Sequence, residues 1–199
     1  WTRARTAANR LVAALPAQPV SAGSEPRLEN LLESTCIVAG IAQPEVRVLP
    51  DQSLNALAVA DGTGATFVVT RGMVDGLGRV ELEGVLANLA ARVRSGAARY
   101  ATTVLALPMP RALAERLLDD AFGDQASVRS DLDAVSFTKY PPGLIRALAT
   151  MAEGGTAVRG APPRSATLWL ADPAGGPGAD VGSAAPQPLA LRIAVLEEL

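Results

Sequence analysis

The stretch of sequence that decides the fold is Glu81-Leu82-Glu83-Gly84-Val85-Leu86-Ala87-Asn88-Leu89-Ala90-Ala91-Arg92. Its apolar residues recur at helical spacing, and the same pattern continues to the end of residues 80–94. The apolar stripe consists of Leu82, Val85, Leu86, Leu89 and Val93. Ser95-Gly96 follows directly, and glycine commonly ends a helix. The spacing therefore predicts an amphipathic helix over residues 80–94 with its apolar side toward the core.

Outward from this helix, the sequence divides into blocks of helical and strand periodicity. Helices are predicted over residues 2–15, 26–40, 72–77, 111–122, 125–137, 141–153 and 188–199. Strands are predicted over residues 45–49, 54–60, 65–70 and 166–171. Asp61-Gly62-Thr63-Gly64 is a good hairpin turn between the second and third of these strands. The order predicts an α+β fold that is mostly helical with a small antiparallel sheet.

The length of the chain bounds its domain organisation. A chain of 199 residues is long enough for one domain with a substantial core. We therefore expect a single domain over residues 1–199. Within it, residues 1–25 form an N-terminal helix and linker, and the Gly/Pro/Ala-rich residues 172–187 form a flexible loop.

Composition excludes several classes of function. The sequence contains no histidine, which excludes a histidine-held metal and a histidine general base. The 18 basic and 20 acidic residues form no basic patch, so we expect no nucleic-acid partner. Cys36 is the single cysteine and cannot form an internal disulfide. No run of about 20 apolar residues is present that could span a bilayer.

The quoted stretch is similar to the active-site helix of the HtpX-type membrane zinc peptidases, whose motif is E-L-x-G-V-x-A-H-E-x-x-H. In that motif two histidines four residues apart hold zinc, and the glutamate polarises the attacking water. The corresponding positions here are Asn88, Leu89 and Arg92, which cannot supply this chemistry. The resemblance also implies a third ligand, a glutamate four residues before an aspartate. Aligning Asp131 with that aspartate places Ser127 at the ligand position.

Other segments resemble the same family in the same order along the chain. Asn55-Ala56-Leu57-Ala58 resembles its N-A-F-A segment, which lies on the strand bordering the substrate groove. Val69-Thr70-Arg71-Gly72-Met73 resembles its V-T-x-G-L segment. Residues 188–193 resemble the end of its T-H-P-P-L-x-x-R-I segment, with Pro186 at the histidine position. The resemblance covers nearly the whole chain and implies a zincin-like domain without its zinc ligands.

These observations lead to the following expectations. We expect a catalytically inactive peptidase homologue, not an enzyme and without a cofactor, that serves as a protein- or peptide-binding or regulatory scaffold. A peptide would add to the exposed edge of the strand that carries residues 55–58. Arg92 would face the former metal position and pair with Asp131, because a buried charge needs a partner.

The alternative is a hydrolase with non-zinc chemistry, which would use carboxylate, Ser or Tyr groups in the former cleft. The resemblance implies a location on the cytoplasmic face of a membrane if segments outside this chain anchor the protein, and otherwise in the cytoplasm.

Overall fold

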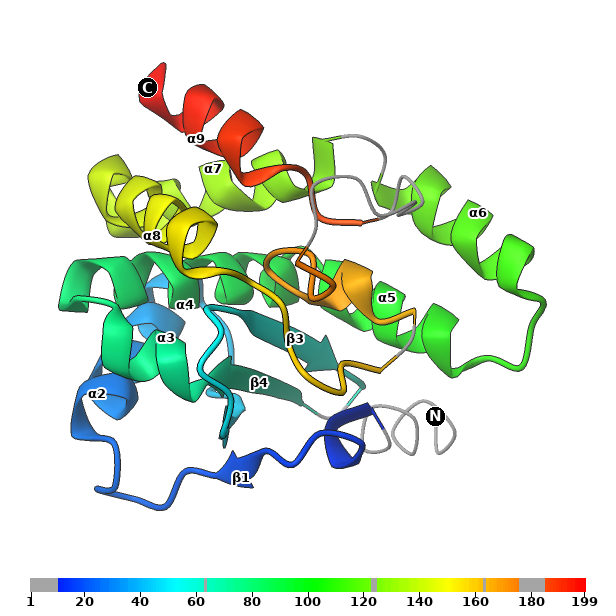
Figure 1. Ribbon diagram of the computed structural model, residues 1–199, viewed down its shortest axis with the longest axis horizontal. Coiled ribbons are helices and arrows are strands. Elements are labelled where there is room, and N and C mark those ends of the chain that lie inside the picture. The colour runs from blue at the N-terminus through cyan, green and yellow to red at the C-terminus, as the bar shows by residue number, and fades with distance from the viewer. Residues whose placement is uncertain (1–10, 63, 123–124, 163, 176–184) are drawn as a thin grey trace.

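The computed structural model describes residues 11–62, 64–122, 125–162, 164–175 and 185–199 (Figure 1). Most of the predicted N-terminal helix lies outside the described residues, and residues 11–13 are helical. The predicted flexible loop over residues 172–187 also lies largely outside them.

The described elements agree with the α+β prediction. The N-terminal half contains β1 (Gln18–Pro19), α2 (Pro26–Ala39), β2 (Glu45–Leu49), β3 (Ala56–Ala60), β4 (Ala65–Thr70), α3 (Arg71–Gly76) and α4 (Arg79–Arg94). The C-terminal half contains α5 (Ala97–Ala106), α6 (Arg111–Phe122), α7 (Ala126–Thr138), α8 (Pro141–Gly154), the 3-10 helix η2 (Ala166–Leu168) and α9 (Leu189–Glu197). The fold is therefore mostly helical with one small sheet, as predicted.

The sheet has the strand order β1-β2-β4-β3 and is mixed. β3 and β4 form the predicted antiparallel hairpin, with Ala58 opposite Phe67. β4 pairs in parallel with β2, so the prediction of a purely antiparallel sheet is wrong for this pair. The physical reason lies in β4, whose residues 67–69 are fully buried and therefore suit a central strand better than an edge.

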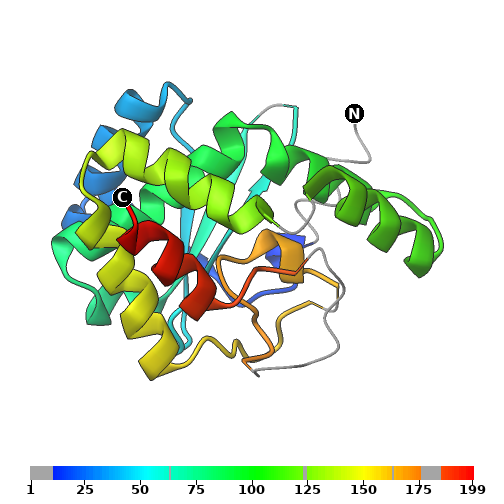
Figure 2. The ribbon, with the colours of Figure 1, turned by 90° about the horizontal axis from the view of Figure 1, so that it is seen from above.

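The helix α4 occupies the centre of the molecule. Figures 1 and 2 show α4 between the sheet and a further layer that contains α7, α8 and α9. Its residues 84–91 are all buried. The buried surface of α4 is therefore wider than the single apolar stripe that the sequence predicts. A Cβ atom at Gly84 would lie 2.9 Å from backbone atoms of Leu144, so this glycine allows α4 and α8 to pack closely.

The segment over residues 165–171 differs from its prediction. In place of a strand, it forms η2 and a single antiparallel bridge between Trp169 and Leu57 of β3. The carbonyl groups of residues 167–169 all accept hydrogen bonds from the guanidinium of Arg92. Successive carbonyls of a strand point in opposite directions, so a regular strand could not make these contacts.

In the part of the chain that the structure describes, no helix combines the length and the apolar character needed to cross a bilayer.

Candidate functional site

Helix α4 places Asn88 and Arg92 one turn apart on the side that faces α7, α9 and residues 165–171. Asn88 is buried, and its Nδ2 atom donates a hydrogen bond of 2.8 Å to Oδ1 of Asp131 on α7. The Asn88 Oδ1 atom is buried and has no hydrogen-bond partner among the described residues. The predicted site residues Asn88 and Asp131 are therefore brought together.

Asp131 makes its main contact with Arg192 of α9. Arg192 Nε donates to Oδ2 and Nη2 to Oδ1, each at 2.7 Å, and both side chains are 0% exposed. Arg192 Nη1 also donates to the carbonyl oxygen of Leu170 at 2.6 Å. The prediction that Asp131 pairs with Arg92 is therefore wrong. The planar fork of Arg192 approaches both carboxylate oxygens, which is the strongest geometry for such a pair.

The side chain of Arg92 binds backbone carbonyl groups instead of a carboxylate. Its Nη1 atom donates to the carbonyl oxygens of Leu168 and Trp169 at 2.9 and 3.0 Å, and Nη2 donates to Thr167. Burial and, to a smaller extent, the charge of Arg192 lower the pKa of Arg92 to about 10, with Asp131 opposing the shift. The guanidinium remains charged at neutral pH, where the carbonyl oxygens satisfy it.

This donor set does not fit the zinc ion that the resemblance implies. Two guanidinium groups and one carboxylate give the cluster an excess positive charge, whereas a zinc site needs anionic or neutral nitrogen, sulfur or oxygen ligands. Asp131 already shares both oxygens with Arg192. Within the described residues, no three His, Cys, Asp or Glu side chains come together as a metal site.

The remaining predicted positions have local structural contacts. Leu89 is fully buried and packs in the main core. Ser127 Oγ accepts a hydrogen bond of 3.3 Å from the backbone of Gln187, and Gln187 Oε1 accepts one of 3.1 Å from Val128 N. These contacts dock the turn that contains Pro186 onto the start of α7, and they do not bring Ser127 into a hydrogen bond with Asn88 or Arg92.

The predicted peptide groove at Asn55, Ala56, Leu57 and Ala58 is filled by the chain itself. All four residues are buried, and Leu170 N donates to the carbonyl oxygen of Ala56 at 2.7 Å. The edge of β3 is therefore covered by residues 168–170, and the expectation of an exposed edge is wrong. Trp169 and its neighbours belong to the core, so displacing them would expose a large apolar area.

The side chain of Asn55 connects β3 to residues 156 and 171 through hydrogen bonds. Its Nδ2 atom donates to the carbonyl oxygens of Thr156 and Ala171 at 2.9 and 3.0 Å. Its Oδ1 atom accepts from Ala56 N at 2.9 Å and from Ala171 N at 3.2 Å. The asparagine thus links β3 to the chain that follows α8, and its role is structural.

Sequence reasoning missed the contribution of Arg192. Arg192 lies in residues 188–193, which resemble the end of the T-H-P-P-L-x-x-R-I segment. The resemblance identifies its position in that segment but not its partner, Asp131. The signal that could have identified it is an arginine flanked by apolar residues in a helix, because such a buried cation needs an anionic partner.

Comparisons with known proteins find related sequences over most of the chain. A protease HtpX homolog of Dictyoglomus thermophilum is 28% identical over 187 residues, which cover 74% of this chain and 61% of that protein. One of Levilactobacillus brevis is 29% identical over 192 residues, covering 74% and 64%. One of Listeria monocytogenes is 40% identical over 84 residues, covering 41% and 27%. No family model matches the chain.

The chain thus spans less than two thirds of the length of these relatives. The relatives are named proteases, which contradicts the prediction that this chain is not an enzyme and points to peptidase activity. The same relatives confirm the resemblance drawn from the motifs: over about three quarters of its length, this chain is similar to proteins named HtpX homologs.

Proposed function

We propose that this domain binds a polypeptide partner and that it does so without a zinc ion between α4 and α7. The observation that carries the proposal is the exposed apolar surface that Leu132 of α7 and Leu191 of α9 form. The relatives are named proteases, and polypeptides are what proteases act on. The bidentate contact between Asp131 and Arg192 supports the zinc-free part of the proposal, because both carboxylate oxygens are already bonded.

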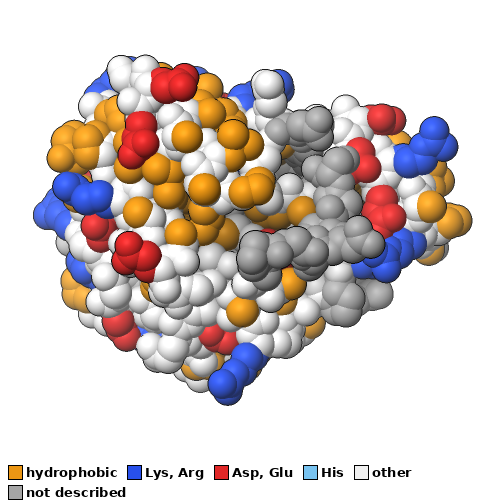
Figure 3. Space-filling view, turned by 45° about the horizontal axis from the view of Figure 1, so that its top comes forward, with side chains coloured by type: hydrophobic (Ala, Val, Ile, Leu, Met, Phe, Trp, Pro, Cys, Tyr) orange, Lys and Arg blue, Asp and Glu red, His pale blue; other side chains and the backbone are white. Residues whose placement is uncertain are grey.

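The α7–α9 face combines large apolar side chains from two adjacent helices. Leu132 on α7 is 38% exposed, and Leu191 on α9 is 50% exposed. Each adjoins one member of the buried Asp131–Arg192 pair, so the two helices are fixed side by side beneath this face. Figure 3 shows apolar side chains gathered over this side of the molecule. Such patches on soluble proteins commonly mark interaction sites.

The expected occupant is an apolar segment of a polypeptide. An apolar surface binds by removing nonpolar area from water, which contributes roughly 25 cal/mol for each Å² buried. A nucleic acid would instead require a basic surface. We also propose a location on the cytoplasmic face of a membrane, which follows from the resemblance to a membrane peptidase family.

Binding to an unfolded polypeptide tests the α7–α9 face. Fluorescence anisotropy of labelled, reduced and carboxymethylated casein should show binding to the unmodified protein. Leu191→Glu and Leu132→Glu should each weaken binding roughly tenfold, because a charge would be buried in the apolar interface. Leu113→Glu is the matched control, because Leu113 on α6 is exposed to a similar extent at 47%. Equal affinity of all the variants would refute the proposed surface.

A second candidate is peptide hydrolysis by groups other than zinc, and the names of the relatives favour it. Both oxygens of Asp131 are bonded to Arg192, so this carboxylate is not free to act as a base. The test is turnover of a quenched peptide library by purified protein, with metal content measured on the same sample. Turnover that survives chelation would support this candidate, and turnover that needs stoichiometric zinc would refute the zinc-free proposal.

A further inference from the structure

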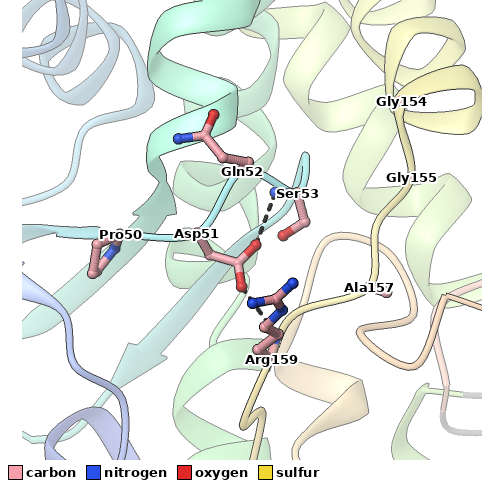
Figure 4. A pocket seen from close by; sticks show the side chains of 8 residues that line it. All are labelled: Pro50, Asp51, Gln52, Ser53, Gly154, Gly155, Ala157 and Arg159. Carbon is pink, nitrogen blue, oxygen red and sulfur yellow. Dashed lines mark hydrogen bonds between the residues drawn. The ribbon is translucent and has the colours of Figure 1, made fainter.

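A pocket of about 460 Å³ is lined by residues other than those of the cluster around Asp131. It opens between the loop Pro50–Ser53, which follows β2, and residues 154–159, which follow α8 (Figure 4). Both walls are close to the start of β3, where Leu54 N donates to the carbonyl oxygen of Gly155 at 2.9 Å. The volume is within the range of small-molecule sites.

Asp51 joins the two walls of the pocket. Its Oδ1 atom accepts a hydrogen bond of 2.8 Å from Ser53 N, and Oδ2 accepts one of 3.1 Å from Arg159 N. Burial by itself raises the pKa of Asp51, but these hydrogen bonds and the charge of Arg159 outweigh it and hold the pKa below its ordinary value. The carboxylate is therefore ionised at neutral pH.

The guanidinium of Arg159 still has capacity for a ligand, whereas Ser53 Oγ is buried beside Asp51. The Arg159 side chain is exposed, and its guanidinium makes no hydrogen bond or ion pair within the described part of the chain. Ser53 Oγ is buried and has no partner there that meets hydrogen-bond geometry, although the hydroxyl is close enough to help lower the pKa of Asp51. Figure 4 shows the side chains of Asp51, Ser53 and Arg159 converging, while the Gln52 amide points away.

We propose that this pocket binds the charged head group of a free α-amino acid. The Arg159 guanidinium holds the ligand carboxylate, and Asp51 accepts from the ligand ammonium group. A guanidinium is the side chain best suited to bind a carboxylate with two parallel hydrogen bonds.

The spacing of the charges selects an amino acid over other small ligands. The Asp51 carboxylate lies against the backbone of Arg159 itself, so the anionic and cationic groups of the pocket are neighbours. A ligand that satisfies both must carry an ammonium group and a carboxylate group close together, as an α-amino acid does on its Cα atom. The two termini of even a short peptide are too far apart, since each residue extends the chain by about 3.3–3.6 Å. A simple anion would leave Asp51 without a counterpart.

The pocket leaves room for the side chain of such a ligand. Gly155 has a positive φ of 85°, and nothing lies within 4 Å of the place where its Cβ would be. A larger residue there would project into this open space and be strained. We therefore expect selectivity for the head group and little for the side chain. This inference is independent of the proposed polypeptide surface on α7 and α9.

Isothermal titration calorimetry of the whole chain tests the assignment. L-Leucine is the probe, and its two single-charge analogues are leucinamide, which lacks the carboxylate, and N-acetyl-leucine, which lacks the ammonium group. Leucine should bind at least tenfold more tightly than either analogue. Equal binding of N-acetyl-leucine would identify a simple anion site and overturn the proposal, as would equal binding of leucinamide or no binding of leucine.

Variants show whether binding occurs at this pocket. Arg159→Met should weaken leucine binding at least tenfold and leave the fold intact, because the contact that Arg159 makes with Asp51 uses its backbone N. Arg116→Met, at an exposed arginine on α6, is the matched control and should bind like the unmodified protein. Unchanged affinity in Arg159→Met, with the Tm also unchanged, would place leucine elsewhere and overturn the assignment.

Discussion

At the scale of single residues, Asp131 shares both carboxylate oxygens with Arg192 in the interior. Replacing Asp131 by Ala would leave the Arg192 guanidinium buried without an anion. Removing one partner of such a pair costs about 3–5 kcal/mol. We expect Asp131→Ala to lower the free energy of unfolding by this amount in urea denaturation.

Asp133 provides the control for this prediction, because it lies on the same helix and its carboxylate forms no ion pair within the described residues. Asp133→Ala should change the free energy of unfolding by less than about 0.5 kcal/mol. A similar loss in both variants would show that the Asp131–Arg192 pair has no special role.

The positions that the resemblance aligns with the motif could be identified from the sequence, whereas the partners of their side chains could not. Asn88, Leu89 and Arg92 lie within one helix, where local spacing determines which side chains share a face. Arg192 is 61 residues from Asp131 in sequence, and several carboxylates were equally available to Arg92 before the fold was known. The pairing depends on how α9 packs against α7.

At the scale of elements, Asn55 links β3 to residues 165–171. Asn55→Ala removes two donors to the carbonyl oxygens of Thr156 and Ala171 and leaves them buried without these bonds. We expect hydrogen exchange at the amides of Leu170 and Ala171 to accelerate at least tenfold. Exchange within the central helix α4 should stay unchanged, because a local opening does not disrupt the core.

The control for Asn55→Ala is Gln52→Ala at an exposed neighbouring loop position. Its exchange pattern should match that of the unmodified protein. Uniform acceleration across α4 in Asn55→Ala would show that the asparagine supports the whole fold and not this one contact.

Asp51 makes the connection between the β2–β3 loop and residues 154–159 sensitive to acid. Its folded pKa lies below the ordinary value of 3.8, so the unfolded chain binds the proton more readily. The stabilisation by Asp51 is therefore fully present above about pH 4 and is lost as the pH falls through the folded pKa. The free energy of unfolding should differ between the unmodified protein and Asp51→Asn at pH 7.

That difference should shrink at pH 3, and chemical denaturation at the two pH values measures it. A difference that is constant with pH would contradict the assigned role of the carboxylate. The other acidic groups titrate in both proteins, so their contribution cancels in the comparison.

Most helices and strands were predictable, because apolar residues recur along them at a regular period or in short runs. The pairing of β4 with β2 and the path of residues 165–171 were not. Strand order depends on contacts between distant segments, and the carbonyls of residues 167–169 turn toward a guanidinium on another element.

At the scale of the whole molecule, the described interior consists mainly of apolar side chains and includes the buried Asp131–Arg192 ion pair. We expect EDTA to leave the Tm unchanged and added zinc ions to produce no increase. A metal that binds only the folded state stabilises it in proportion to the logarithm of the metal concentration, so the Tm of a zinc-dependent fold would shift. Differential scanning calorimetry makes the measurement.

The same experiment on an authentic zinc peptidase shows that the chelator treatment is effective. A fall in the Tm of this protein with EDTA, restored by zinc ions, would mean that the cluster of Asn88, Asp131 and Arg192 rearranges around a metal.

The sequence alone predicts an α+β fold and a resemblance to the HtpX-type peptidases, and it contains no histidine. Composition and local periodicity suffice for that, because residue identity and spacing along one element do not depend on the rest of the chain. The partner of Asp131 and the closure of the β3 edge by Trp169 emerge only in three dimensions. So does the convergence of Asp51, Ser53 and Arg159. Each depends on contacts between segments distant in sequence, and packing of the whole chain determines which of the many combinations forms.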